Sequence, residues 1–277
     1  MKHLKVLAGL ILFLLCSVWG EVALVDNTYK IWRASGTNPG NWAKIPSNKQ
    51  VKAVSYASND YLWALEKGTG KVYVIDALDI WTCFGQPTGD GIDICAQNHP
   101  VSSAYYLDGQ GFIYRHIKDT RWEYVTRVSG AVGIAGSLDG VYAVCNNGEV
   151  CHYSHGSGLN YLASIPNGWG WDIAYDESQN ALVATGWYPA RSTPVGYCYN
   201  FGNSSWYIPG PNWIPSYWVD CNNNNIASID VYSSSAQWKV FMYDNTPCYY
   251  YSGVYHIENQ PVNYFFDIAV NPVKEFP

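Results

Sequence analysis

The stretch from Ala131 to Tyr153 reads AVGIAGSLDGVYAVCNNGEVCHY. It contains three short apolar runs, which are separated by the polar turns Leu-Asp-Gly and Asn-Asn-Gly. Apolar runs between turns of this kind are typical of antiparallel β-hairpins. The same order recurs in VKAVSYASNDYLWALEKGTGKVYVID, from Val51 to Asp76. Both stretches therefore predict a unit of three consecutive strands.

An aromatic residue opens each unit, and the openers follow one another at intervals of 39 to 45 residues: Trp42, Trp81, Trp122, Tyr161, Trp206 and Tyr249. A period of this size indicates a repeat architecture. The chain after Tyr249 is too short for a whole unit, whereas Val22 to Ser35 supplies two strand-like runs before the first opener. We expect six units in a closed all-β ring, with the last unit built from both termini and Phe265 to Val270 as its innermost strand. Such closure removes open sheet edges.

The first twenty residues have the pattern of a secretory signal peptide. Lys2 and Lys5 form a positive end, residues 6–15 are apolar, and residues 18–20 offer a cleavage site. An uncleaved membrane anchor is the alternative interpretation. No later apolar run has the length of a membrane-spanning helix. We therefore expect a signal peptide over 1–20 and one secreted, extracellular domain over 21–277, without a membrane span.

The composition favours uncharged polar ligands. Charged residues make up 14% of the chain and aromatic residues 16%, and the formal net charge is −6. Because there is no basic stripe, nucleic acid is a poor partner. The chain contains no Gly-x-Ser-x-Gly, no His-Glu-x-x-His and no phosphate-binding glycine loop. We therefore expect a binding protein that is not an enzyme and needs no cofactor or metal.

Cysteines and one sequon fit an extracellular chain. Cys145 and Cys151 flank a tight turn, and a loop over 147–149 would place their sulfurs opposite each other, so we predict a disulfide. Zinc bound by these cysteines with nearby histidines is the rival interpretation, but the spacing fits no usual finger. Loss of the signal peptide leaves an odd number of cysteines, which favours self-association through an unpaired thiol. Asn203 begins an Asn-Ser-Ser sequon and is a predicted glycosylation site. The pairing of the other five remains open: Cys83, Cys95, Cys198, Cys221 and Cys248.

The aligned units resemble the tectonin repeat. Trp42 followed by Ile45-Pro46 matches its opener, and LNYLASIP, from Leu159 to Pro166, keeps the Ile-Pro pair with tyrosine in place of tryptophan. GQGFIYRHI, from Gly109 to Ile117, matches the end of the repeat. The fifth and sixth units depart from the pattern, since SSSAQWKVFMY replaces the usual glycine turn.

The resemblance implies a single six-bladed β-propeller of four-stranded blades, as in tectonins and fish-egg lectins. It also implies a secreted lectin that binds glycans or glycoproteins without catalysis. The divergence among the units implies that the sites are fewer than six and differ from one another.

Aspartates recur at one position of the predicted inner strands, as Asp93, Asp172 and Asp267. One interpretation is a ring of carboxylates around the channel that holds calcium. The other, which we favour, is that each aspartate accepts backbone N–H groups from a neighbouring inner strand.

Aromatic residues outside the repeat pattern are the better binding candidates, whereas the openers are expected mainly to pack between blades. Two irregular segments and one polar run supply the predicted carbohydrate-binding residues: Trp187, Tyr188 and Arg191; Trp213, Tyr217 and Trp218; and Asn222 and Asn223.

Three functions compete. The first is a glycan-binding lectin, the second a structural or protein-binding component of an extracellular coat or matrix, and the third a calcium-dependent propeller hydrolase. Binding on a glycan array, a size shift on reduction, and stabilisation by calcium would support the first, second and third, respectively.

Overall fold

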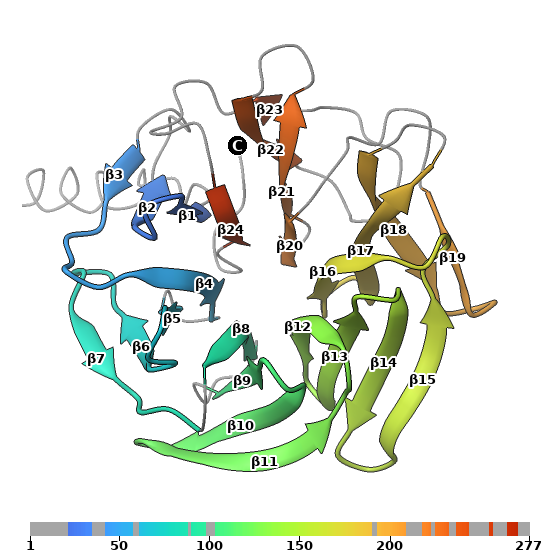
Figure 1. Cartoon of the computed structure of the whole chain (residues 1–277), viewed down its shortest axis with the longest axis horizontal. Coiled ribbons are helices and arrows are strands. Elements are labelled where there is room, and N and C mark those ends of the chain that lie inside the picture. The colour runs from blue at the N-terminus through green and yellow to red at the C-terminus, as the bar shows by residue number, and fades with distance from the viewer. Residues whose placement is uncertain are drawn as a thin grey trace, which may run out of the picture.

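The computed structural model describes residues 22–34, 42–57, 61–87, 90–97, 103–189, 193–208, 218–222, 225–232, 237–243, 255–256 and 265–270. In this part of the chain every regular element is a strand, and the strands form six four-stranded antiparallel sheets. The sheets are arranged around a central axis as the blades of a β-propeller (Figure 1). The prediction of an all-β propeller with four-stranded blades is therefore confirmed.

Each blade is numbered here from the unit that supplies its innermost strand. Blade 1 contains β4 (Val51–Tyr56), β5 (Leu62–Glu66), β6 (Val72–Ile75) and β7 (Trp81–Cys83). Blade 2 contains β8 (Gly91–Gln97), β9 (Ser103–Asp108), β10 (Phe112–Lys118) and β11 (Arg121–Arg127). Blade 3 contains β12 (Ala131–Ser137), β13 (Gly140–Cys145), β14 (Glu149–Ser154) and β15 (Gly158–Ser164).

The remaining blades follow the same order. Blade 4 contains β16 (Gly170–Asp176), β17 (Ala181–Tyr188), β18 (Thr193–Asn200) and β19 (Ser205–Tyr207). Blade 5 contains β20 (Trp218–Asn222), β21 (Asn225–Tyr232), β22 (Gln237–Tyr243) and β23 (Tyr255–His256). Blade 6 contains β24 (Phe265–Val270), β1 (Val22–Asp26), β2 (Ile31–Ala34) and β3 (Trp42–Lys44).

The two ends of the chain close the ring. β24 pairs antiparallel with β1, so that Ile268 lies opposite Leu24 and Ala269 opposite Ala23. The inner strands contact one another in a cycle, from β4 through β8, β12, β16 and β20 to β24 and back to β4. The predicted closure by N- and C-terminal strands is confirmed, because β1, β2 and β3 complete the sheet in which β24 is the innermost strand.

The five described openers, Trp42, Trp81, Trp122, Tyr161 and Trp206, lie in the outermost strands, and two of them join neighbouring blades; Tyr249 lies outside the described residues. Trp122 of β11 donates its indole N–H to the carbonyl of Phe84 at a distance of 2.9 Å, which links blades 2 and 1. Trp206 of β19 is buried and donates to the carbonyl of Ala163 in blade 3 at 3.4 Å. The packing role is therefore confirmed for these two openers. Tyr161 is an exception, because its side chain is mostly exposed.

The predicted disulfide between Cys145 and Cys151 is wrong. The strand register places Ala143 opposite Cys151 and Val144 opposite Val150, and both cysteines are free thiols. The turn is centred one residue earlier than expected, because Gly148 adopts a φ of 80° and its N–H donates to the carbonyl of Cys145 at 2.8 Å. The two sulfurs therefore lie diagonally across the hairpin rather than opposite each other.

Candidate functional site

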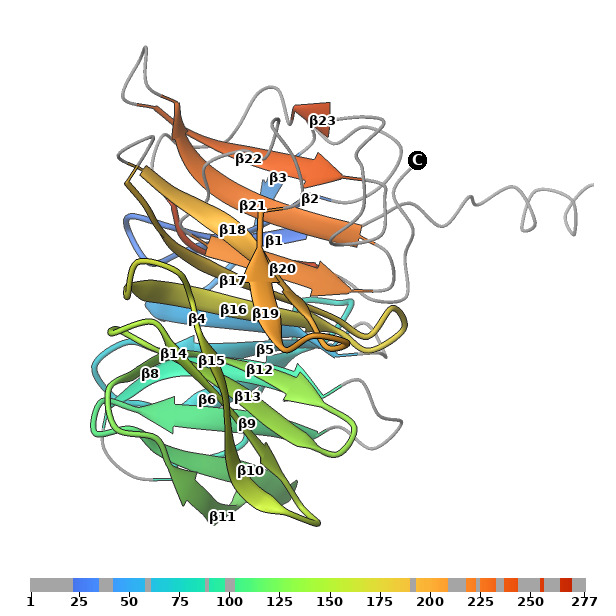
Figure 2. The same cartoon turned by 90° about the vertical axis from the view of Figure 1, so that its right-hand side faces the viewer.

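The strands run between two opposite faces of the propeller, as the side view shows (Figure 2). Inner strands begin at one face, which we call the entry rim and which includes Gly91 and Gly170. They end at the other face, which we call the exit rim and which includes Gln97 and Asp176. Candidate chemistry occurs in three places: around the axis, on the exit rim and on the entry rim.

The recurring aspartates around the axis link alternate pairs of blades. One carboxylate oxygen of Asp93 accepts the N–H of Ile134 at 2.8 Å, across the gap between β8 and β12. Asp172 likewise accepts the N–H of Val219 at 2.9 Å, and Asp267 that of Val54 at 2.5 Å. The favoured structural interpretation of these aspartates is therefore confirmed.

The central cavity is too small for a sugar. The three aspartates line a space of about 40 Å³, which holds a few water molecules at most. Burial raises the pKa of Asp93 to about 7, although two backbone N–H groups act in the opposite direction. Burial, followed by the charge of the neighbouring carboxylates, also raises the pKa of Asp172 and of Asp267. This environment stabilises protonated, hydrogen-bonded acids.

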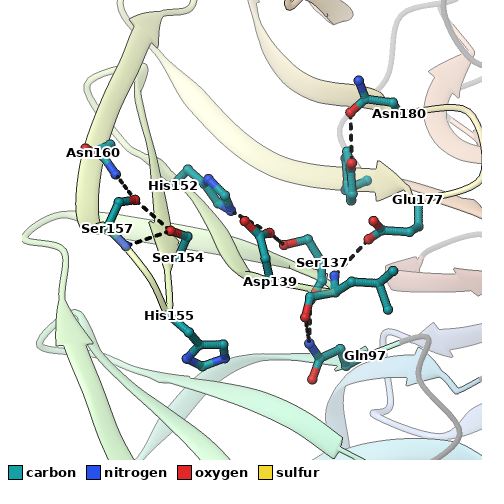
Figure 3. A network of polar contacts seen from close by, with 12 residues as sticks. Gln97, Ser137, Asp139, His152, Ser154, His155, Ser157, Asn160, Glu177 and Asn180 are labelled. Atoms are coloured by element: carbon teal, nitrogen blue, oxygen red, sulfur yellow. Dashed lines mark hydrogen bonds and ion pairs between the residues drawn. The ribbon is translucent and has the colours of Figure 1, made fainter.

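A polar network on the exit rim also joins blades (Figure 3). Gln97 donates to the carbonyl of Ser137 at 2.5 Å, and the N–H of Leu138 donates to Glu177 at 2.8 Å. These bonds connect blade 2 to blade 3 and blade 3 to blade 4. Asp139 accepts the hydroxyl of Ser137 at 2.9 Å and lies 3.4 Å from His152.

The order of groups in this network does not suit nucleophilic catalysis. The aspartate stands between the hydroxyl and the imidazole, whereas an activated serine needs the imidazole beside it. His152 also stacks on Tyr142, with ring centroids 4.2 Å apart, and burial lowers its pKa. The network therefore connects and orders the turns of three blades.

Three tryptophans gather on the entry rim of blade 4, and we call them the indole cluster. Trp169 precedes β16, Trp171 is the second residue of β16, and Trp187 is near the end of β17. The ring centroids of Trp169 and Trp171 are 6.1 Å apart, and those of Trp171 and Trp187 are 6.5 Å apart. The side chain of Trp169 is 60% exposed, which is unusual for so large an apolar ring.

A β-bulge in the inner strand places Trp171 in the cluster. The pairing of β16 with β17 shifts between Gly170 and Asp172, so that Trp171 is the extra residue. Shifts at the matching places of blades 1, 2 and 3 leave Lys52, Ile92 and Val132 as the extra residues. The bulge therefore belongs to the scaffold, and blade 4 differs by presenting an indole there.

Close backbone packing fixes the position of Trp169. A Cβ on Gly186 would lie 2.7 Å from the carbonyl oxygen of Trp169, and one on Gly148 would lie 3.0 Å from its backbone nitrogen. Glycine at both positions therefore lets this backbone pass between the β13–β14 turn and β17. The exposed Asn147 lies in that turn, and its Oδ1 accepts the N–H of Glu149 at 3.1 Å, whereas the side-chain oxygen of Asn146 lies near Gly130.

Hydrogen bonds fix the other end of the cluster. The hydroxyl of Tyr197 donates to the carbonyl of Trp187 at 3.0 Å, and the side chain of Asn167 donates to the same carbonyl at 3.4 Å. The backbone that carries the indoles is thus held by strands, by the buried Tyr197 and by the exposed Asn167, which lowers the entropy lost when a ligand binds.

The predicted binding residues fall into three groups. Trp187 and Tyr188 are half-buried and lie in β17, not in an irregular loop, because the segment forms an extended hairpin with β18. Trp218 begins β20 and Asn222 ends it, so these two backbone positions lie at opposite rims. The others lie outside the described residues: Arg191, Trp213, Tyr217 and Asn223.

Sequence reasoning missed Trp169 and Trp171. The signal that could have found them is the segment Asn-Gly-Trp-Gly-Trp-Asp, residues 167–172, which places two indoles just before a recurring inner-strand motif. Asn203, the predicted glycosylation site, is exposed in the turn between β18 and β19 and accepts the hydroxyl of Ser205 at 2.7 Å. The predicted signal peptide lies outside the described residues, and in the described part no helix could span a membrane.

Comparison with sequence-family profiles and with curated proteins gave no match. Solved structures share the fold. A chain of a nidogen/laminin complex has a TM-score of 0.70 at 12% identity, over 92% of this chain and 99% of that one. TolB from Acinetobacter baumannii has 0.66 at 11% identity, over 91% and 67% of the two chains. A catalytically inactive virginiamycin B lyase from Staphylococcus aureus, with quinupristin, has 0.54 at 14% identity, over 82% and 74%. At these identities the likeness establishes a β-propeller fold and assigns no function.

Proposed function

We propose that this protein is a secreted, non-catalytic lectin on a six-bladed, tectonin-like scaffold, and that it binds glycans through the indole cluster. The observation that carries the proposal is the ordered row formed by the exposed Trp169 and the half-buried Trp171 and Trp187. Aromatic faces offer apolar contact to the C–H face of a sugar, and their few rotatable bonds limit the entropy cost. The exposed Asn147 in the adjoining turn offers its side-chain NH2 as a donor to a hydroxyl group, while its Oδ1 accepts the N–H of Glu149.

The chemical surroundings support a neutral ligand. The three indoles and Asn147 are uncharged, and the exposed carboxylate of Glu149 in the same turn disfavours an anionic ligand. The tilt between successive rings, 51° and 53°, makes a curved platform rather than a flat one. Such a platform suits a glycan that presents more than one ring face.

The test is a glycan array probed with the mature chain, with and without calcium. We expect binding that calcium does not change and that Trp169→Ala lowers at least tenfold, which corresponds to about 1.4 kcal/mol of binding free energy. The matched control is Tyr161→Ala, because Tyr161 is about as exposed and lies in the outermost strand of blade 3. Absence of binding to every glycan, or equal loss in both variants, would contradict the proposal.

A second candidate function is covalent assembly into an extracellular coat or matrix. The observation that favours it is the free, exposed thiol of Cys83 on β7, the outermost strand of blade 1. A thiol at this position is accessible to a second copy of the chain. Non-reducing electrophoresis of the secreted protein tests it: a dimer that disappears on reduction and in Cys83→Ser would support assembly, and a monomer under oxidising conditions would exclude it.

A further inference from the structure

A second cavity opens on the exit rim of blade 1, far along the chain from the indole cluster. It has a volume of about 310 Å³, at the lower end of the usual range for small-molecule sites. Six residues line it: Tyr61, Val74, Asp76, Ile80, Thr82 and Phe84. Val74 lies in β6, Thr82 in β7, and Asp76 and Ile80 in the turn between them, while Tyr61 directly precedes β5 and Phe84 directly follows β7.

The carboxylate of Asp76 has one oxygen to spare. Its Oδ1 accepts the N–H of Leu78 at 2.8 Å and that of Ile80 at 2.9 Å, which caps the β6–β7 turn. Its Oδ2 accepts no hydrogen bond from the described residues. The turn needs only one oxygen, so the other is available to a ligand in the cavity.

Capping aspartates differ in whether the second oxygen is used: in the described part of the chain Asp76 and Asp108 both leave Oδ2 unused, whereas Asp26 uses both oxygens. Asp26 caps the β1–β2 turn in the same way, with Oδ1 accepting the N–H groups of Thr28 and Lys30. Its Oδ2, however, accepts the indole N–H of Trp32 at 2.7 Å. Both carboxylate oxygens of Asp26 thus accept hydrogen bonds from the protein, whereas only one oxygen of Asp76 does.

The remaining lining groups suit a sugar ring. Tyr61 is 38% exposed and Ile80 is 57% exposed, so both present apolar surface to a ligand. The hydroxyl of Thr82 makes no hydrogen bond within the described residues and can serve a ligand hydroxyl as donor or acceptor. Apolar walls with a few unsatisfied polar groups are the usual composition of a small-molecule site.

The cavity wall is already in place without a ligand. Asp79 in the same turn forms an ion pair with Arg33 of blade 6, with 3.0 Å between the charged atoms. Thr82 lies opposite Val74 in the β6–β7 ladder, which fixes both side chains on one face. Ordering the site therefore adds little entropy cost to ligand binding.

From these contacts we propose that the cavity is a monosaccharide subsite, in which a pyranose donates one hydroxyl to Asp76 and exchanges a hydrogen bond with Thr82 while its C–H face lies on Tyr61 and Ile80. The ligand class rests on the proposed lectin function, but the site is separate from the indole cluster and lies on the opposite rim.

The experiment uses the mature chain and saturation-transfer NMR with the methyl glycosides of glucose, galactose, mannose and N-acetylglucosamine at millimolar concentration. We expect at least one glycoside to bind, and Asp76→Asn to weaken that binding at least tenfold, because it turns an acceptor into a donor. An asparagine retains an oxygen that can cap the turn, so the melting temperature should change little. Thr82→Val, which has nearly the same shape, should weaken binding to a lesser degree.

Two controls separate this subsite from the indole cluster. Asp108→Asn changes a matching cap, whose carboxylate accepts the N–H groups of Gln110 and Phe112 outside the cavity, and it should leave glycoside binding unchanged. Trp169→Ala should abolish array binding but leave the NMR signal. If no glycoside binds, or if Asp76→Asn binds like the parent, the subsite is disproved whatever the array shows. If the array fails while the NMR result holds, only the indole-cluster proposal is disproved.

Discussion

The ring of inner-strand aspartates and the indole cluster are neighbours on β16, yet they differ in whether their residues recur in other blades. Asp172 has counterparts at Asp93 and Asp267, and all three accept an N–H from the next inner strand. Trp171 immediately precedes Asp172. The matching bulge positions hold Lys52, Ile92 and Val132 in blades 1 to 3 and Phe266 in blade 6, so blade 4 alone among these places an indole there. In this propeller, the recurring aspartates make buried hydrogen bonds that build the scaffold, whereas the indoles of blade 4 reach the rim, where Trp169 is exposed.

The difference has a physical basis. A repeat unit can be stable only if each copy satisfies the same backbone groups and buries the same face, so those residues recur. A ring that protrudes into water adds no such stability and usually costs solubility. Four predictions test whether scaffold and site separate in this way.

The largest expected decrease in the free energy of unfolding follows from replacing a packed opener. Trp122→Ala removes the contacts with Trp63, Tyr106 and His116, whose ring centroids lie 5.2 to 6.4 Å from that of Trp122. We expect it to lower the free energy of unfolding by about 3–5 kcal/mol, as for large core aromatics. Urea denaturation measures this. Tyr124→Ala on the same strand is the control, because its ring is 55% exposed, and a similar loss in both variants would contradict the packing role.

The next effect concerns the aspartate ring. Asp172→Ala removes the acceptor for the N–H groups of Val219 and Ile173. An unsatisfied buried donor costs about 1–3 kcal/mol, and we expect a loss of this order in urea denaturation. Glycan binding at the rim should persist in the folded fraction. Unchanged stability would show that water replaces the carboxylate and that the stability of the fold does not depend on the aspartate ring.

A smaller effect should appear as a pH dependence. The pKa of Asp93 is about 7 in the folded chain because of burial, whereas an unfolded aspartate titrates near 3.9. Between roughly pH 4 and 7 the folded chain keeps a proton on Asp93 that the unfolded chain releases, so stability should fall as pH rises through this window. Asp93→Asn should reduce the slope of the urea midpoint against pH. A parent midpoint that rises over the same window would refute this assignment.

Much of this scaffold could be predicted from the chain, and particular residues show why the rest could not. Openers such as Trp122 and the Asp-Ile pairs repeat, so their structural roles follow from the period. The turn beside Cys145 depends on the positive φ of Gly148, and a shift of one residue there separates the predicted disulfide partners. The exposure of Trp169 depends on contacts with Gly186, which lies on the next strand and leaves no mark in a local pattern.

Trp169→Ala should have the smallest effect on stability and the largest effect on glycan binding. Trp169 is mostly exposed, and its backbone, not its ring, fits between Gly148 and Gly186. Trp169→Ala should therefore change the free energy of unfolding by no more than about 0.5 kcal/mol, as at other surface positions. Trp187→Ala, whose half-buried ring packs on Trp171, should cost more stability while also weakening glycan binding. Urea denaturation and array titration of both variants measure the two effects. If Trp169→Ala unfolds the protein, the indole cluster belongs to the scaffold, and the contrast with the aspartate ring is lost.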